Sequence, residues 1–411
     1  MIKTITKILT SSYSGAGLIF FVQVLTANAM DVKDFGMIAA GLSLVALFSP
    51  IIGFGLDSFI YKYSARNSGD LYDLLQSAKS YVFFSSFIAI ACFLLFAESN
   101  KTYLMVVMLL SQFSLGLSLA ILQIRAKYNH YSILSLCQGS IRLLLFSLVV
   151  YFYQNITLEL AVGTYIVSAI TVLIVSICII YLDIKNHASE PRIKKYTTVN
   201  LLKDSFPFGI GTLSFIIYTQ SVIYFINKFD SPESAALFSV AYIFLSMTFM
   251  IPTAIFQKFL IPKLHVLVQD KVDLSKLFSF GNTLMFTLGI CFTFIVYASA
   301  DLLISVLYDN RYTEASSLLK GLTVVIFLRF ISSNSAAYLM TGNYMSIKNK
   351  IMLTVAVINV ILMCLFVPIY GVNGAVYIII LCEVMISTAY IYYVKQKFFK
   401  GYHYKYFFGF E

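Results

Sequence analysis

The sequence has little charge and no tryptophan. Only 12% of its 411 residues are Asp, Glu, Lys or Arg, whereas 59% are hydrophobic and the mean hydropathy is +0.85. A soluble fold of this length has no use for so much apolar surface, so the composition excludes an ordinary globular protein and indicates many membrane crossings. The longest stretches that are not apolar, 182–204 and 258–278, leave no room for a soluble catalytic domain.

Motifs of catalysis and metal binding are also missing. There is no HExxH, GxSxG or Walker motif, so the sequence encodes no nucleotide-driven chemistry. The six cysteines all fall in apolar runs without a CxxC pair, and the four histidines lack metal-ligand spacing. We therefore expect no enzyme, no metal and no resident cofactor. The net charge of +10 is explained below by membrane topology rather than by nucleic-acid binding.

About twelve apolar runs are present, each near the ~20 residues with which a helix crosses a bilayer. We expect these helices at 8–28, 36–60, 80–97, 102–124, 133–153, 158–181, 206–227, 235–257, 279–299, 316–340, 351–369 and 372–394. The sequence thus predicts an all-α polytopic membrane protein with two six-helix lobes. The N-terminal lobe would cover 1–181 and the C-terminal lobe 205–394, with a cytoplasmic linker at 182–204 and a cytoplasmic tail at 395–411.

The positive charges predict the orientation. With the N-terminus inside, 22 of the 29 Lys and Arg residues fall in inner segments, four fall outside and three lie within apolar runs. This asymmetry predicts that both termini are cytoplasmic. We interpret 8–28 as a retained helix, although Ala27-Asn28-Ala29 imitates a signal-peptide cleavage site. Pro50 and Pro252, predicted in the middle of the second and eighth helices, favour a duplicated bundle with kinked helices.

A few ionisable residues lie deep in the apolar runs, where charge is costly unless it faces protein or water. Arg142 shares a helix face with Ser135 and Gln138, and Arg329 has Ser332 close by on the next turn. We expect the two arginines, one from each lobe, to face a water-filled cationic cavity, because guanidinium groups bind phosphate bidentately.

Two acidic residues and one lysine complete this set. Glu383, near the centre of the twelfth helix, could be a proton or sodium site or the internal partner of an arginine, and the sequence leaves these alternatives open. Asp57, at the inner end of the second helix before Lys62, is either a gating residue or an interfacial one. Lys320 is expected to extend toward the outer membrane surface.

Several segments carry a family likeness over the whole chain: Asp34-Phe35-Gly36, Ile52-Gly53-Phe54-Gly55-Leu56-Asp57-Ser58-Phe59-Ile60, Ala235-Ala236-Leu237-Phe238-Ser239-Val240-Ala241-Tyr242 and Val367-Pro368-Ile369-Tyr370-Gly371-Val372-Asn373-Gly374-Ala375. In their order and spacing the sequence resembles the O-antigen and capsular polysaccharide flippases. These form the polysaccharide-transporter branch of the multidrug/oligosaccharidyl-lipid/polysaccharide exporter superfamily.

The resemblance implies two lobes around a central cavity in the bacterial plasma (inner) membrane. It implies that undecaprenyl-diphosphate-linked oligosaccharide repeat units are moved from the cytoplasmic to the outer leaflet, by alternating access, for O-antigen, lipopolysaccharide or capsule biosynthesis. Arg142 and Arg329 fit the cationic cavity residues of the family, with Gln138 and Ser332 beside them.

Coupling to H⁺ or Na⁺ would involve Glu383 or Asp57. Expected partners are the lipid-linked oligosaccharide, membrane lipids, and the polysaccharide polymerase and chain-length machinery. Relatives often carry an aspartate in the seventh helix, where this sequence reads Tyr218-Thr219-Gln220-Ser221, so an ion site there is in doubt.

Three alternative functions compete with the flippase. A drug or cation exporter of the same superfamily would require an acidic cavity, which two arginines oppose. A peptidoglycan lipid flippase resembles fourteen-helix proteins, and this chain has no room for two more helices. An O-antigen polymerase or ligase has a long outward loop, whereas the longest outward segment here, about 299–315, is short.

Overall fold

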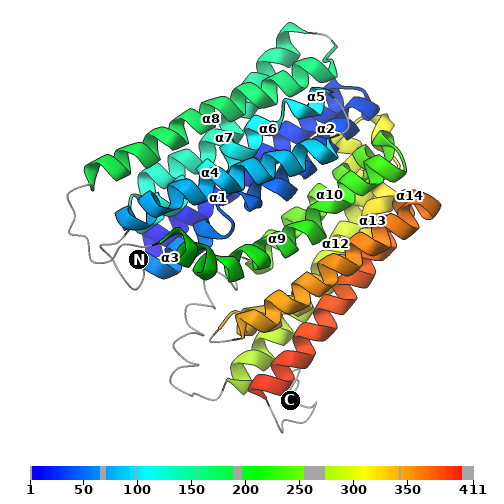
Figure 1. Ribbon diagram of the computed structural model, residues 1–411. Helices are drawn as coiled ribbons and strands as arrows, with labels where there is room; N and C mark the ends of the chain where they lie inside the picture. Colours follow the sequence, from blue (N-terminus) through cyan, green and yellow to red (C-terminus); the bar gives the residue numbers. More distant parts are fainter. Residues whose placement is uncertain are drawn as a thin grey trace. The chain divides into compact units, whose positions relative to one another are not determined.

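The computed structural model describes residues 2–64, 71–97, 100–153, 155–187, 197–253, 274–341 and 344–399. Within these ranges all regular structure is helical (Figure 1). The chain divides into two compact units, Met1–Tyr224 and Phe225–Glu411. These are called the N-terminal unit and the C-terminal unit, and each is described by itself.

The N-terminal unit is a bundle of long helices with three short ones between them. In chain order its elements are α1 (Ile2–Ala29), α2 (Val32–Phe48), the 3₁₀ turn η1 (Ser49–Ile51), α3 (Leu56–Ser64), α4 (Leu71–Phe96), α5 (Asn100–Tyr103), α6 (Val106–Ile124), α7 (Tyr128–Phe152), α8 (Leu158–Asn186) and most of α9 (Thr198–Phe229). Helix α7 packs against α1 on one side and α8 on the other, and α6 also packs on α8. Close approach of α1 and α7 requires glycine, since a Cβ on Gly139 would lie 2.7 Å from Cβ of Leu18.

The C-terminal unit is built around α13. Its elements are the end of α9, α10 (Pro232–Thr253), α12 (Ser275–Leu307), η3 (Asn310–Tyr312), α13 (Ala315–Leu339) and α14 (Met345–Phe398). Helix α13 packs against α10, α12 and α14. This central position explains why α13 buries nearly one whole side, including Leu319, Leu322 and Ile326.

Ten helices in the described part of the chain are long and apolar enough to cross a membrane. They confirm the predicted all-α polytopic membrane protein. One of them, α14, contains both of the last two predicted spans. The full count of twelve stays a prediction, as do the two six-helix lobes.

The two segments of α14 meet at Gly371. This residue has φ +58° and ψ −146°, a conformation essentially restricted to glycine. The two segments fold back on one another, as a contact between them shows: the Asn359 amide donates to the Cys382 sulfur at 3.6 Å. The predicted tight turn between 351–369 and 372–394 is therefore present.

The predicted second helix, 36–60, is wrong as a single helix. The chain leaves helical geometry at η1 and turns through Gly53 (φ +59°) and Gly55 (φ +77°) before α3 begins. Helix α4 satisfies the freed backbone groups: the Gly53 N–H donates to the Ser85 hydroxyl at 2.8 Å, and the Tyr81 hydroxyl donates to the Phe54 carbonyl at 3.1 Å. Irregular backbone is tolerated at membrane depth when protein side chains bond it in this way.

Pro50 does not lie in the middle of a helix, as the sequence suggested, but in η1, just after α2. Proline lacks an N–H and disrupts a continuing helix, so it is accommodated better near a helix end than at a central kink. Pro252 lies inside α10, one residue before the last described residue of that segment, and its predicted mid-helix position stays a prediction.

The division between the units falls inside α9, later than the 182–204 segment that the sequence singled out. The first turns of α9 pack into the N-terminal unit, where Phe206 lies 5.5 Å from Phe54, measured between ring centroids. Gly209 of α9 is pressed against the backbone of Gly55, so closely that a Cβ on Gly55 would lie 2.3 Å from the Gly209 nitrogen. Residues 188–196 of the predicted linker and 400–411 of the tail lie outside the described residues.

The predicted outward segment 299–315 is shorter than expected because α12 continues to Leu307. Asp301, on the last turns of α12, forms an ion pair with Lys320 of α13 at 2.6 Å. Lys320 therefore has a carboxylate partner, and the predicted extension of its side chain toward the outer membrane surface stays a prediction.

Candidate functional site

Arg142 is a buried cation on α7 of the N-terminal unit. Only 6% of its surface is exposed, and its guanidinium carbon lies 5.1 Å from the centre of the Tyr165 ring on α8. Its Nε donates to the Ser168 hydroxyl at 3.3 Å. Within the described ranges no carboxylate pairs with Arg142. Among the described residues, the site therefore holds a positive charge without an acidic partner; its predicted role in a cationic cavity stays a prediction.

Neighbouring residues hold this guanidinium in place. Phe146, one turn after Arg142, packs edge-on against Tyr165 with ring centroids 5.1 Å apart. Ser168 lies one turn after Tyr165 and donates to the Tyr165 carbonyl at 2.7 Å, which orients its oxygen to accept from Arg142. A cation on an aromatic face is attracted by the ring quadrupole, by about 2 kcal/mol when it is desolvated.

Gln138 lies one turn before Arg142 on the same face of α7, as predicted. It is 8% exposed, and its amide makes no hydrogen bond to any residue that the structure describes. An amide beside an arginine adds both donors and an acceptor for a polar ligand. Arg142 and Gln138 together form the polar part of what we call the α7 site.

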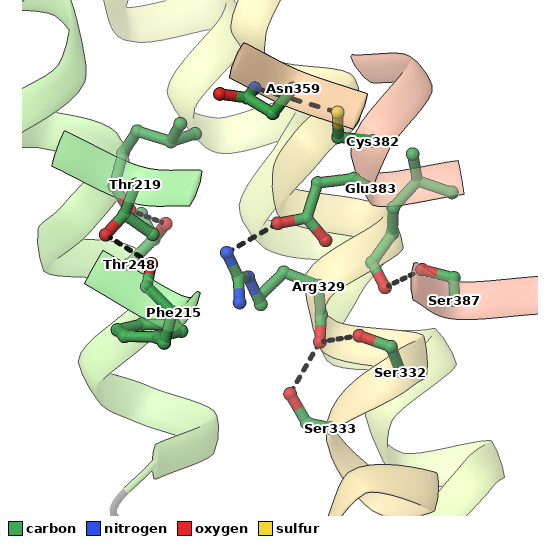
Figure 2. Close-up of polar contacts among 12 residues, drawn as sticks. Phe215, Thr219, Thr248, Arg329, Ser332, Ser333, Asn359, Cys382, Glu383 and Ser387 are labelled. Atoms are coloured by element: carbon green, nitrogen blue, oxygen red, sulfur yellow. Dashed lines mark hydrogen bonds and ion pairs between the residues drawn. The ribbon is translucent and has the colours of Figure 1, made fainter. Parts of the chain in front are cut away.

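Arg329, on α13 of the C-terminal unit, has a different environment. Its Nη2 pairs with Glu383 Oε1 of α14 at 2.5 Å (Figure 2). The Glu383 side chain is fully buried, whereas the Arg329 side chain is 16% exposed. The guanidinium carbon also lies 4.8 Å from the centre of the Phe249 ring on α10. Of the three alternatives for Glu383, the structure shows the internal partner of an arginine; a coupling role stays a proposal.

Serine hydroxyls surround the backbone at Arg329. Ser332 and Ser333 both donate to the Arg329 carbonyl, at 3.1 and 2.5 Å, and Ser387 of α14 donates to the Leu328 carbonyl at 3.1 Å. In Figure 2 these hydroxyls gather at the backbone of α13, while the guanidinium points toward Glu383. The structure therefore places Ser332 as a backbone partner of Arg329; its predicted role in substrate binding stays a prediction.

Asp57 lies in the first turn of α3, and its carboxylate accepts from the Ser58 N–H at 2.7 Å. A carboxylate there favours the start of the helix through the helix dipole. Asp57 lies on α3 and not on α7, and its gating role stays a prediction. The prediction that Arg142 and Arg329 share one cavity concerns both units together and also stays a prediction.

Sequence reasoning missed Tyr165, Ser168 and Phe249. Ser168 carried a signal, as a polar residue in an otherwise apolar run one turn after a tyrosine. Phe249 carried none, because one phenylalanine among 37 becomes distinctive only through the helix packing that places it on Arg329.

Several solved structures of membrane proteins have a similar fold. One is "Lipid II flippase MurJ, inward closed conformation", with a TM-score of 0.68 and 15% identity, covering 94% of this chain and 87% of that one. A second is a MOP superfamily transporter from Pyrococcus furiosus, described as having a binding pocket of reverse polarity, with a TM-score of 0.62, 11% identity and coverage of 96% and 95%. A third is an inward-facing MATE family multidrug resistance transporter, with a TM-score of 0.61, 12% identity and coverage of 93% and 94%. The chain thus shares the fold of these multi-pass membrane proteins.

The family follows from the sequence itself. The profile of the polysaccharide biosynthesis protein family matches residues 1–267, well over half of the chain. The chain belongs to the polysaccharide biosynthesis protein family. No curated protein matches it closely enough to count as a relative.

Proposed function

We propose that this protein is a flippase that carries undecaprenyl-diphosphate-linked oligosaccharide repeat units from the cytoplasmic to the outer leaflet of a bacterial plasma membrane. The observation that carries the proposal is Arg142: a buried guanidinium, held by Tyr165 and Ser168, without an acidic partner in the described chain. A diphosphate is the anionic group of such a lipid, and guanidinium binds phosphate oxygens through paired hydrogen bonds. Membership of a polysaccharide biosynthesis family supports this substrate class.

Movement would follow alternating access, with the oligosaccharide and diphosphate in the protein and the lipid tail in the bilayer. Glu383 or Asp57 would couple transport to a proton or sodium gradient. Both termini would be cytoplasmic, and the lipid product would pass to a polysaccharide polymerase and its chain-length machinery. The likeness to a MATE transporter keeps export of a cationic drug as the alternative, but a buried arginine without a carboxylate repels cations.

The direct test is mass spectrometry of lipids that co-purify with the protein from its native membrane. We expect a polyprenyl-diphosphate-linked oligosaccharide. Its absence, together with export of cationic dyes, would favour the alternative.

Variants of the two arginines extend the test to cells. Arg142→Ala and Arg329→Ala should each abolish surface polysaccharide while the protein still inserts in the membrane. The lysine variants should keep partial function, since a point cation still attracts phosphate. Normal surface polysaccharide with both alanine variants would refute the assignment.

A further inference from the structure

Helix α3 has one buried face and one polar face. Leu56, Phe59 and Ile60 are buried in a core that α3 forms with α4, α6 and α9. Asp57 and Tyr61 lie one turn apart on the other face, where Asp57 is half-buried and 40% of Tyr61 is exposed. The packing of α3 therefore presents a carboxylate and a phenol together on an accessible face.

The neighbouring helices α6 and α7 add polar groups beside Tyr61. The Tyr61 hydroxyl donates to Gln123 Oε1, near the end of α6, at 3.1 Å. Partial burial raises the pKa of Tyr61, and the nearby Tyr131 of α7 and Asp57 raise it further. The phenol therefore stays protonated at neutral pH. We call Asp57, Tyr61 and Gln123 the α3 cluster.

The α3 cluster has hydrogen-bonding capacity to spare. Asp57 Oδ1 accepts from the Ser58 N–H at 2.7 Å, and Gln123 Oε1 accepts from Tyr61. Among the residues that the structure describes, nothing donates to Asp57 Oδ2 or accepts from the Gln123 amide nitrogen.

These spare groups match a carbohydrate. A carboxylate that accepts and an amide that donates suit the hydroxyl groups of a sugar, which do both. The exposed part of the Tyr61 ring offers an apolar surface to the C–H groups of the same sugar. The Asp57 carboxylate repels a phosphate, so the α3 cluster favours the sugars of a glycolipid over its diphosphate.

The α3 cluster also lies in line with the α7 site. Tyr131, Gln138 and Arg142 are seven and four residues apart, which places them on one face of α7. At 1.5 Å per residue, Tyr131 and Arg142 are about 16 Å apart along the helix. An oligosaccharide of a few sugars spans such a distance, with its diphosphate at Arg142 and its far sugars at α3.

We propose that Asp57, Tyr61 and Gln123 form a carbohydrate site, separate from Arg142, that binds the sugars of the lipid-linked oligosaccharide. Asp57 then serves the cargo and not a coupling ion. The proposed function supplies the diphosphate anchor in this division, whereas the sugar site rests on the α3 cluster alone.

The test measures binding of two lipids to the protein in nanodiscs, which need no sugar-based detergent. One probe is the repeat-unit lipid extracted from the native membrane, and the other is undecaprenyl diphosphate without sugar. Asp57→Asn and Gln123→Leu should each bind the repeat-unit lipid about fivefold more weakly, the effect of one lost hydrogen bond. Tyr61→Ala should bind it about tenfold more weakly, because the ring and the hydroxyl are both lost. All three should bind undecaprenyl diphosphate within about twofold of the unaltered protein, since Arg142 is distant.

Tyr151→Ala is the matched control. Tyr151 is 82% exposed at the opposite end of α7, and its variant should bind both lipids like the unaltered protein. Asp57→Asn keeps the shape of its side chain, and thermal melts identify the variants that fold. Equal weakening of both lipids by folded variants, or no weakening of either, would overturn the sugar site.

The free oligosaccharide, released from the repeat-unit lipid, separates the sugar site from the proposed function. If the unaltered protein binds neither lipid but binds the oligosaccharide, and Gln123→Leu loses that binding, the proposed cargo is wrong and the sugar site holds. If both lipids bind through Arg142 and the α3 variants leave the preference between them unchanged, the sugar site is wrong and the cargo stands.

Discussion

Replacing Gly371 with alanine should destabilise the C-terminal unit. A Cβ at this position would lie 2.8 Å from Asp230 Oδ2, closer than a real Cβ tolerates, and the φ of +58° with ψ of −146° is strained for any other residue. That strain costs about 1–3 kcal/mol. The same Asp230 oxygen accepts from the Val372 N–H at 2.8 Å, and this hydrogen bond, exposed and charged, would weaken by about 1 kcal/mol as the carboxylate moves.

The two effects sum to about 2–4 kcal/mol. The C-terminal unit, Phe225–Glu411, has 187 residues (411 − 224), and a domain of that size changes its Tm by about 2–4 °C for each kcal/mol. We therefore expect Gly371→Ala to melt roughly 5–15 °C lower, measured by thermal denaturation of the purified protein in detergent.

Gly321→Ala is the matched control in the same unit. Gly321 lies inside α13, and the nearest atom to its Cβ would be Val376 Cγ1 at 3.5 Å, an ordinary contact. Alanine favours a helix over glycine by about 1 kcal/mol, so this variant should melt at the same temperature or higher. If Gly371→Ala melted within 2 °C of Gly321→Ala, about the shift that 1 kcal/mol produces, the reasoning on this turn would be refuted.

Three further predictions concern other parts of the chain. Gly55→Ala should lower the yield of folded protein, because its Cβ would lie 2.3 Å from the backbone nitrogen of Gly209 and the residue has a φ of +77°. Gly116→Ala is the control and should be neutral, because a Cβ there would have nothing within 4 Å. Equal yields of the two variants in membrane extracts would contradict this prediction. The Arg311 guanidinium, hydrogen-bonded to Asp309, lowers the pKa of that carboxyl, so Arg311→Ala should cost stability at neutral pH and less as the pH falls below about 4. The pair is well exposed, so thermal melts should show a difference below about 0.5 kcal/mol, and a difference that grows toward acid pH would be the wrong sign. Single cysteines at 190 and 400 should resist an impermeant thiol reagent in intact cells while one at 311 reacts, and labelling of 190 from outside would refute the cytoplasmic linker.

Local sequence patterns were sufficient to predict most of the helices and part of the candidate site. Run lengths located most of the membrane helices, although α4, α9 and α12 each extend eight or nine residues beyond one predicted end. The segment Val367–Ala375 located the turn at Gly371, because only glycine adopts that conformation without strain. Arg142 and Gln138 follow from helical spacing alone. These features depend on residues near each other in the sequence.

What was missed depends on contacts between helices. The pairing of Arg329 with Glu383 joins residues 54 positions apart, and neither helix contains a sign of the other's register. The break at Gly53–Gly55 is stable because Ser85 and Tyr81 bond the freed backbone, and the sequence around Pro50 indicated a kink instead. The choice of Arg329 as the partner of Glu383 and the broken helix were therefore not predictable from periodicity and composition.

Translocation in proteoliposomes tests the proposed function most directly. A fluorescent undecaprenyl-diphosphate-linked sugar in the inner leaflet would be followed by its quenching with an impermeant reductant outside. We predict that the protein moves the lipid outward at least ten times faster than the lipid moves in protein-free vesicles. Arg142→Ala should lose most of this rate, and a tenfold loss corresponds to an activation free energy higher by about 1.4 kcal/mol. A rate equal to that of protein-free vesicles, or full activity of Arg142→Ala, would contradict the assignment of this protein as a flippase that holds its cargo at Arg142.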